Sequence, residues 1–353
     1  MPNELDLYTP QTLTEAVNLI IPETFYLTKV LDTGAPYLPG TESLLFDVVT
    51  HRRDLAPLGH NGDPATRVDF GGGYKTFTVT PPQIFLEDQV AAGAIAARRM
   101  AGQSPINAGS AGVDGIVAAL NDYIAEKQQN MVDSIARRIE WMWAQAVTTG
   151  KIDYTDSNGR PFSIDYGVPS GNLFTASQKW DASSNAGDPV LQIQQWQRQF
   201  AKVNGVKPTV FVLGEAAADA FRGNKAVDGW LKSAGVQVLQ INVGTNEDLV
   251  TPVGTIPGVG TLVEYGGVFP EGGATKPFIP ADCLVMTHPK LWRMAYGAIS
   301  DFDLGAVPVG AMPRFSKMKD SKDGKSKSLF VESHPLPILQ RDTGTLVVKV
   351  CGS

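Results

Sequence analysis

The longest periodic pattern in the chain covers residues 113–149. Apolar side chains recur there at steps of three, four or seven residues, which places them on one face of a helix. These positions are Ile116, Leu120, Ile124, Met131, Ile135, Ile139 and Met142. At 1.5 Å per residue such a helix is roughly 55 Å long, several times the usual length. This length favours a structural strut over an ordinary core helix.

Two strand-like runs precede this helix, at residues 44–50 and 74–80, and the second continues in a run at 83–86. A polar middle rich in Gly and Pro separates the two runs, which is typical of a loop. A two-stranded hairpin of this length is only marginally stable alone in water. Residues 46–90 therefore predict an extended two-stranded loop. Unless this loop folds against the body, something outside the chain should cover it.

Residues 1–45 predict an N-terminal arm. Two apolar stretches, at 13–21 and 25–31, are flanked by prolines, and the arm has six acidic residues against one lysine. It therefore lacks the clustered Lys and Arg that hold nucleic acid. Because the arm is too short to form its own core, we expect its apolar side chains to be buried on another surface, such as that of another subunit.

The rest of the chain predicts shorter elements. Residues 151–164 form a hairpin around the Asn158-Gly159 turn, and the lysine-rich stretch 314–327 is a solvated loop. Amphipathic or buried patterns predict helices at 190–203 and 215–221, and strands at 209–214, 236–241, 260–265, 283–287, 336–339 and 345–350.

Catalytic and cofactor motifs are missing from the sequence: it has no phosphate-binding loop, no nucleophile elbow and no zinc pattern. Residues 154–165 approach a calcium loop, but Tyr154 stands where a carboxylate is required, so the hairpin is the better interpretation. The two cysteines, Cys283 and Cys351, are too few for a disulfide framework. We expect no enzyme, no cofactor and no metal site.

Charge and hydropathy argue against further classes of protein, namely nucleic-acid-binding, membrane and secreted proteins. The 353 residues carry 30 basic and 36 acidic side chains, a net charge of −6, which argues against nucleic-acid binding by the whole surface. No apolar run approaches the roughly 18 residues that span a bilayer. The acidic N-terminus lacks the basic and apolar regions of a secretion signal. We expect no membrane contact, and folding in a reducing compartment.

Four diffuse segments carry a resemblance to a known family. They are Pro82-Gln83-Ile84-Phe85-Leu86 leading to Arg98-Arg99; Val210 to Phe221; Val263-Glu264-Tyr265-Gly266-Gly267 running on to Phe278-Ile279-Pro280-Ala281-Asp282; and Ser333-His334-Pro335-Leu336-Pro337-Ile338. With the order of the parts, they resemble the major capsid proteins of tailed bacteriophages, in particular the lambda-like capsid protein E family with the Hong Kong 97 fold.

This resemblance covers nearly the whole chain and implies an α+β fold divided into named parts. These are an arm at 1–45, an extended loop at 46–90, a peripheral domain at 91–164 including a spine helix at about 113–149, an axial domain at 165–312, and peripheral C-terminal strands at 313–353.

The resemblance also implies partners. Copies of the chain would assemble as pentamers and hexamers of an icosahedral shell that encloses double-stranded DNA, after synthesis in the host bacterial cytoplasm. Further implied partners are a separate scaffolding protein, a decoration protein at threefold positions, a portal protein, and weak non-specific contact with packaged DNA. The expected subunit contacts are Leu13, Phe25, Tyr26, Arg52, Arg53, Tyr74, Phe77, Arg98, Arg99, Lys317 and Lys319.

Two alternatives remain open from the residues. A bacterial nanocompartment shell of the encapsulin type shares the fold, but such shells tend to replace the arm with a cargo-recruiting helix, whereas residues 1–45 are irregular and interrupted by prolines. The second alternative is a soluble hydrolase with an unrecognised site. Particle size separates the two classes, because a shell forms megadalton particles or capsomers and a hydrolase is a small monomer with turnover.

Overall fold

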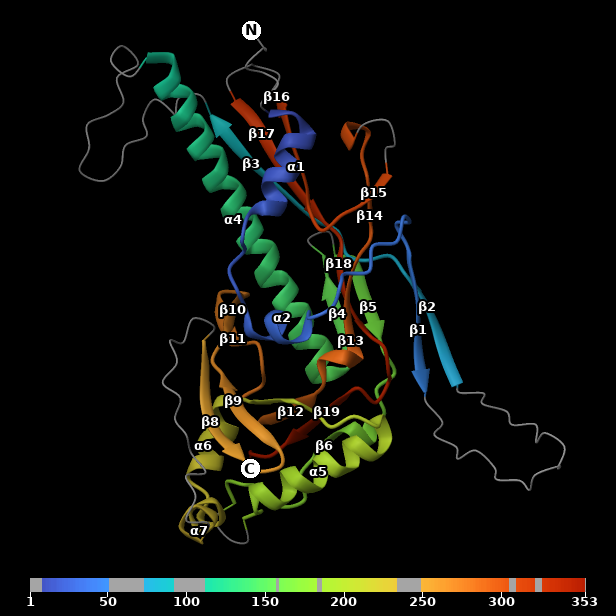
Figure 1. The fold of residues 1–353 in the computed structure, drawn as a ribbon, viewed down its shortest axis with the longest axis vertical. Helices are drawn as coiled ribbons and strands as arrows, with labels where there is room; N and C mark the ends of the chain where they lie inside the picture. Colours follow the sequence, from blue (N-terminus) through green and yellow to red (C-terminus); the bar gives the residue numbers. More distant parts are fainter. Residues whose placement is uncertain are drawn as a thin grey trace, which may run out of the picture.

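The computed structural model describes residues 8–50, 73–91, 112–156, 159–182, 186–233, 249–304, 309–320 and 326–352. Helices and strands are mixed, as expected for an α+β fold. The long helix α4 runs obliquely through the molecule, with a small sheet beside its upper half and a larger sheet below its C-terminal end (Figure 1). The β1–β2 hairpin projects away from the body on the opposite side from α4.

Helix α4 spans Gly112–Thr149, so the predicted helix is present. Its apolar stripe is buried in the described part, with Met131, Ile135 and Met142 almost fully covered. The helix ends at Gly150, which adopts a left-handed φ of 67° and donates its N–H to Ala146 O at 3.0 Å. A Cβ at Gly150 would approach Val168 Cγ2 to 2.5 Å, so only glycine fits this terminus.

The upper sheet consists of three antiparallel strands in the order β16-β17-β3. Its strands are β3 (Ile84–Ala91), β16 (Phe315–Asp320) and β17 (Ser326–Ser333). Two expectations are corrected here. The stretch 314–327 is not simply a solvated loop, because Phe315 and Ser316 are buried in β16. The last part of the expected extended loop, at 84–90, pairs instead with β17.

The lower sheet has six strands in the order β6-β19-β12-β7-β9-β8. The strands are β6 (Leu173–Thr175), β7 (Val210–Leu213), β8 (Val250–Ile256), β9 (Gly260–Tyr265), β12 (Cys283–Thr287) and β19 (Thr345–Lys349). Strands β7 and β12 are buried at every position, which explains their unbroken apolar sequences. Helices α5 (Pro189–Asn204), α6 (Glu215–Arg222) and α7 (Lys225–Ser233) belong to this half (Figure 1).

Strand β19 corrects the division of the chain at residue 313. It was expected among peripheral C-terminal strands, but it pairs with β12 on one side and β6 on the other. The reason is burial: four of its five residues are covered, which requires a place inside the larger sheet. The other predicted strands 209–214, 260–265, 283–287 and 336–339 are present, whereas the one at 236–241 lies outside the described residues.

Short helices and hairpins complete the fold around the two sheets and α4. They are α1 (Pro10–Leu19), α2 (Tyr26–Leu31), the hairpins β4 (Lys151–Thr155)–β5 (Pro161–Asp165), β10 (Val268–Glu271)–β11 (Ala274–Pro277) and β14 (Ala298–Ser300)–β15 (Val309–Ala311), and the pair β13 (Trp292–Tyr296)–β18 (Pro335–Leu339). The predicted hairpin at 151–164 is thus confirmed. Trp292 packs edge-on against Trp143 of α4 at 5.6 Å, so the helix and β13 share one core.

Candidate assembly interface

The first helix of the N-terminal segment packs on the same chain. Thr9 caps α1 through Thr12 N, and Leu13 and Val17 are buried against the body. Thr14 Oγ1 donates to Ser316 O at 3.1 Å and accepts from Ser316 N at the same distance, which fixes α1 beside β16. Its C-terminal end is held by the Arg314 guanidinium, which donates to Val17 O at 2.9 Å and to Ile20 O at 3.2 Å.

The second helix of this segment is held by a buried carboxylate of α4. Glu140 Oε1 accepts from Leu27 N at 2.9 Å and from the Tyr265 hydroxyl at 2.8 Å. Oε2 accepts from Thr28 N at 2.8 Å and from Thr28 Oγ1 at 2.7 Å. Glu140 therefore caps the N-terminus of α2, which has no side-chain cap of its own, and joins it to β9. Burial raises the pKa of Glu140, and these hydrogen bonds offset part of that shift.

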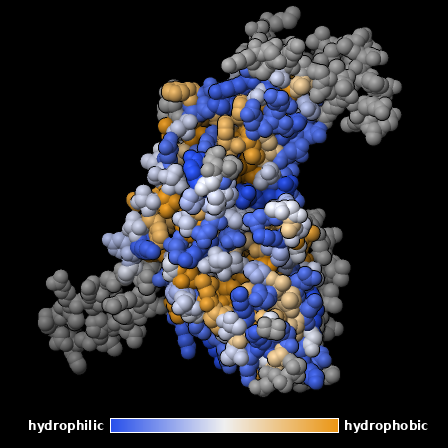
Figure 2. Space-filling view, turned by 180° about the vertical axis from the view of Figure 1, so that it is seen from behind, coloured by the Kyte–Doolittle hydropathy of each residue, from blue (hydrophilic) through white to orange (hydrophobic). Residues whose placement is uncertain are grey.

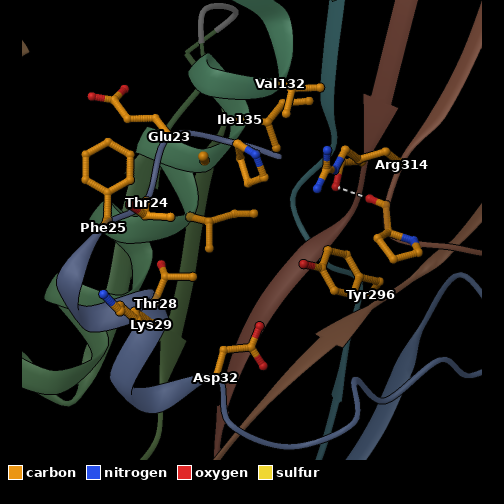
Figure 3. Close-up of a pocket in the computed structure, with 15 residues that line it drawn as sticks. Glu23, Thr24, Phe25, Thr28, Lys29, Asp32, Val132, Ile135, Tyr296 and Arg314 are labelled. Carbon is orange, nitrogen blue, oxygen red and sulfur yellow. Dashed lines mark hydrogen bonds between the residues drawn. The ribbon is translucent and has the colours of Figure 1, made fainter. Parts of the chain in front are cut away.

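A cavity of about 280 Å³ lies between this segment and the body. Figure 3 shows Phe25, Thr28 and Asp32 on one side, with Ile135 of α4 and Tyr296 and Arg314 facing them across the space. Burial raises the pKa of Asp32 from 3.8 to about 6. The lining has two carboxylates, Glu23 and Asp32, and no cysteine or histidine, which is typical of a seam between packed elements.

The β1–β2 hairpin touches the body through one face only. Its strands are β1 (Leu44–Thr50) and β2 (Gly73–Val79), paired in antiparallel register from Leu44–Val79 to Thr50–Gly73. Phe46 stacks on Phe77 at 5.4 Å and lies 6.5 Å from the Tyr166 ring. The opposite face is open, since Leu45 is exposed and Tyr74 is 72% exposed. This face offers apolar and aromatic surface that the described part of the chain leaves uncovered.

Apolar side chains are also exposed on the body. Leu19 and Ile21, beyond the covered part of α1, are both at least 80% exposed, and Phe302 is 91% exposed. Figure 2 shows apolar surface as separate patches within polar surroundings rather than as one continuous face. Separate patches suit contacts with several neighbouring molecules, because each patch can be covered by a different one.

Comparison with known proteins agrees with this picture. The family model for phage major capsid protein E matches residues 9–350 of the chain. The chain belongs to this family.

Solved structures show the same fold. The putative capsid protein of a prophage from Escherichia coli CFT073 is 19% identical to this capsid protein, with a TM-score of 0.68, and the match covers 98% of this chain and 99% of the other. A phage-related protein from Bordetella bronchiseptica RB50 is 14% identical, with a TM-score of 0.51 and coverage of 97% of each chain. No curated protein matches. The fold is therefore the one expected from the Hong Kong 97 resemblance, and the family decides for a phage capsid over an encapsulin-type shell.

The predicted contact residues fall into four groups. Tyr74 is on the open face of the hairpin, and Phe77 is half-buried under the Phe46 ring. Leu13 and Phe25 are buried within the same chain, and Tyr26 is half-buried beside Tyr265, so the body of the same chain supplies the surface that covers them. The four predicted arginine contacts lie outside the described residues: Arg52, Arg53, Arg98 and Arg99.

The predicted lysine contacts take part in an internal ion network. Lys317 is buried and pairs with Asp301, and its Nζ lies 3.2 Å from Asp303. Burial alone would lower the pKa of Lys317, but its hydrogen bonds to the two aspartates raise it above its usual value. Lys319 is exposed and lies 3.7 Å from Asp303. Lys317 therefore has its charge satisfied within the chain, and only Lys319 is available at the surface.

The cysteines and the possible metal ligands of the described residues can be placed one by one. The two cysteines are free and buried, and burial raises the pKa of Cys283 to about 12, so this thiol keeps its proton at neutral pH. No group of three His, Cys, Asp or Glu side chains in that part of the chain is placed to hold a metal ion. No helix there is long and apolar enough to cross a membrane.

Sequence reasoning missed Glu140, a buried carboxylate that accepts four hydrogen bonds. Its signal was partial, because Glu140 stands between Ile139 and Trp141 but also lies one turn after Arg137 on the same side of the helix. A charge at such a position must be neutralised or hydrogen-bonded. What the pattern could not supply was the identity of its partners, which come from segments more than 100 residues away.

Proposed function

We propose that copies of this capsid protein associate as pentamers and hexamers that close into an icosahedral head shell around double-stranded phage DNA. Family membership supports the role in the virion. The observation that carries the proposal is the β1–β2 hairpin, which leaves the body with one face packed and the other open. Two strands are marginal alone, so a neighbouring copy is the natural cover for the open face.

In this assembly the parts of the chain have the roles that the resemblance implies, with one change in which strands belong to the axial domain. The hairpin acts as the extended loop, α4 as the spine, and the lower sheet as the axial domain, now including β19. Tyr74 with Leu45 on the hairpin, and Leu19, Ile21 and Phe302 on the body, are the proposed contacts between copies. The predicted arginine contacts at positions 52, 53, 98 and 99 remain part of the proposal.

The partners beyond the shell itself are a separate scaffolding protein, a portal protein and a decoration protein at threefold positions. The protein is made in the host bacterial cytoplasm. Packaged DNA touches it weakly and without sequence preference. The net charge of −6 supports weak rather than tight contact with DNA, because a strongly basic inner surface would be needed for the latter.

The test is the size of the purified protein. Sedimentation velocity and negative-stain microscopy of the full chain should show capsomers or closed shells. A stable single molecule at high concentration would contradict the proposal. A monomer that also turned over an ester or phosphate substrate would favour the hydrolase alternative instead.

A further inference from the structure

The outer face of α5 carries exposed cations beside a groove. Arg198 and Lys202 lie one turn apart on the helix, and Lys207 follows its end. They line a groove of about 540 Å³ between α5 and the β8–β9 turn at Pro257 and Gly258. A second hollow, of about 350 Å³, lies on the other side of Arg198 and Lys202, so these two cations form a ridge between two depressions.

These cations lack the carboxylate partners that several other exposed cations have. Arg160 pairs with Asp156 at 2.7 Å, and Lys276 pairs with Glu271 at 2.6 Å. Within the described residues, the three cations of the groove form no such ion pair, and no Asp or Glu lines either hollow. Three positive charges therefore lie close together without a neighbouring carboxylate, although the chain as a whole has a net charge of −6. Such a site attracts an anion.

The neutral residues around the cations are hydrogen-bond donors rather than apolar anchors. Gln194 and Gln197 line the groove, and Gln195 and Gln199 line the hollow on the other side. Gln197 is buried, and its amide nitrogen already donates to the carbonyl oxygens of Gly258 and Val259 at 3.4 Å. The glutamines that reach the surface beside the cations are therefore Gln194, Gln195 and Gln199. Arginine, lysine and glutamine side chains are the groups that contact phosphate oxygens of nucleic acid.

The kind of anion follows from what the groove lacks. Neither hollow is lined by an aromatic side chain, so there is no platform on which the bases of a single strand could stack. An acidic protein segment would need apolar anchors in a buried centre, and the groove offers only Ala201 and Pro257. A repeating phosphate backbone needs neither feature.

We propose that this groove binds the phosphate backbone of duplex DNA without sequence preference. The inference rests on the proposed function, and it places this face of the chain on the inner side of the shell. It assigns the weak DNA contact to Arg198, Lys202 and Lys207.

The test uses the full chain before assembly, so that its result does not depend on shell formation. A fluorescent duplex of mixed sequence is titrated with the protein between about 50 and 200 mM salt. Three phosphate contacts give a slope of log K against log salt of about −3. The double variant Arg198→Gln and Lys202→Gln should reduce this slope by about two and weaken binding at least about tenfold at the lower salt.

The control is the double variant Arg160→Gln and Lys276→Gln, which changes the net charge equally at exposed cations that already have carboxylate partners. It should bind DNA almost as the unchanged chain does. Equal losses in both double variants, no binding by the unchanged chain, or binding of polyglutamate in preference to DNA would each overturn the proposal. Shell formation is scored separately by microscopy. Its failure in the unchanged chain would contradict the proposed function while leaving the DNA result readable.

Discussion

The N-terminal segment and the β1–β2 hairpin both carry apolar side chains that they cannot bury by themselves, and these side chains are covered in different ways. Both carry apolar side chains and are too short to form a core. Helix α2 packs on its own chain, with Phe25 6.0 Å from Phe278 and the helix N-terminus bonded to Glu140. The hairpin covers only the face with Phe46 and Phe77 and leaves Tyr74 exposed.

The difference lies in the surface available to each segment. Helix α4 is long enough to offer a buried stripe and an acceptor to the N-terminal segment, so that segment becomes part of the body. The hairpin points away from α4 (Figure 1), and its Phe46 ring packs 6.5 Å from the Tyr166 ring of the body. Burial of the first segment supports folding of the monomer, whereas the open face of the second supports association.

The largest expected effect comes from a substitution that places a charge in the core of the monomer. Ile135→Asp places a charge at a position that is 2% exposed and should destabilise the monomer by at least about 4 kcal/mol, giving insoluble protein. Solubility and urea unfolding measure this. The matched control is Ile21→Asp, at a position 80% exposed, which should leave the unfolding free energy nearly unchanged. A soluble, stable Ile135→Asp protein would show that the helix face is wrongly assigned.

The next effect is on assembly alone. The hairpin register pairs Thr50 with Gly73, so residues 51–72 can be replaced by an Asn-Gly turn that joins the two strands directly. We expect a monomer with unchanged unfolding and no shells in negative-stain images. Rebuilding the segment with the original sequence should restore particles. Normal shells from the shortened chain would contradict a role of residues 51–72, with the predicted contacts Arg52 and Arg53, between copies.

Glu140 tests the attachment of α2. In Glu140→Gln, an amide NH₂ replaces an oxygen that accepts hydrogen bonds, so a donor faces a donor in a buried site. The unfolding free energy should fall by about 2–4 kcal/mol. Tyr265→Phe removes only one of the four bonds and should cost about 1 kcal/mol. Equal, negligible effects of the two changes would show that the bonds to Glu140 contribute little.

The smallest effect concerns pH. Because the pKa of Asp32 is raised from 3.8 to about 6, the folded state binds its proton more tightly than the unfolded state does. Its contribution to stability is therefore fully present below pH 3.8 and is lost as the pH rises to about 6. Asp32→Asn should be more stable at neutral pH by about 1 kcal/mol and should lack this dependence. Parallel urea midpoints of the two proteins across this range would refute it.

The pattern of apolar and polar residues predicted a helix or hairpin correctly where that pattern depends on one element alone. The spacing along 113–149 gave α4, and the Asn158-Gly159 turn gave the β4–β5 hairpin. Long-range pairing could not be predicted in this way. An apolar run such as 345–350 fits any buried position, so the place of β19 between β12 and β6 depends on the whole sheet.

The candidate contacts show the same limit. Exposure of Tyr74 followed from a hairpin that has only one partner face. Burial of Leu13 on another surface was predicted, but the pattern could not show that β16 of the same chain provides that surface. The partners of Lys317 were also hidden, since Asp301 and Asp303 come from a different segment of the chain.

Hydrogen–deuterium exchange of the unassembled chain and of purified shells tests most directly whether the body closes on itself while the hairpin depends on a neighbour. The account predicts that amides at 44–50 and 73–79 exchange quickly in the free chain and become protected in the shell. Amides of α4 between 131 and 149 should be protected in both. Equal protection of the hairpin in the two states would contradict the account.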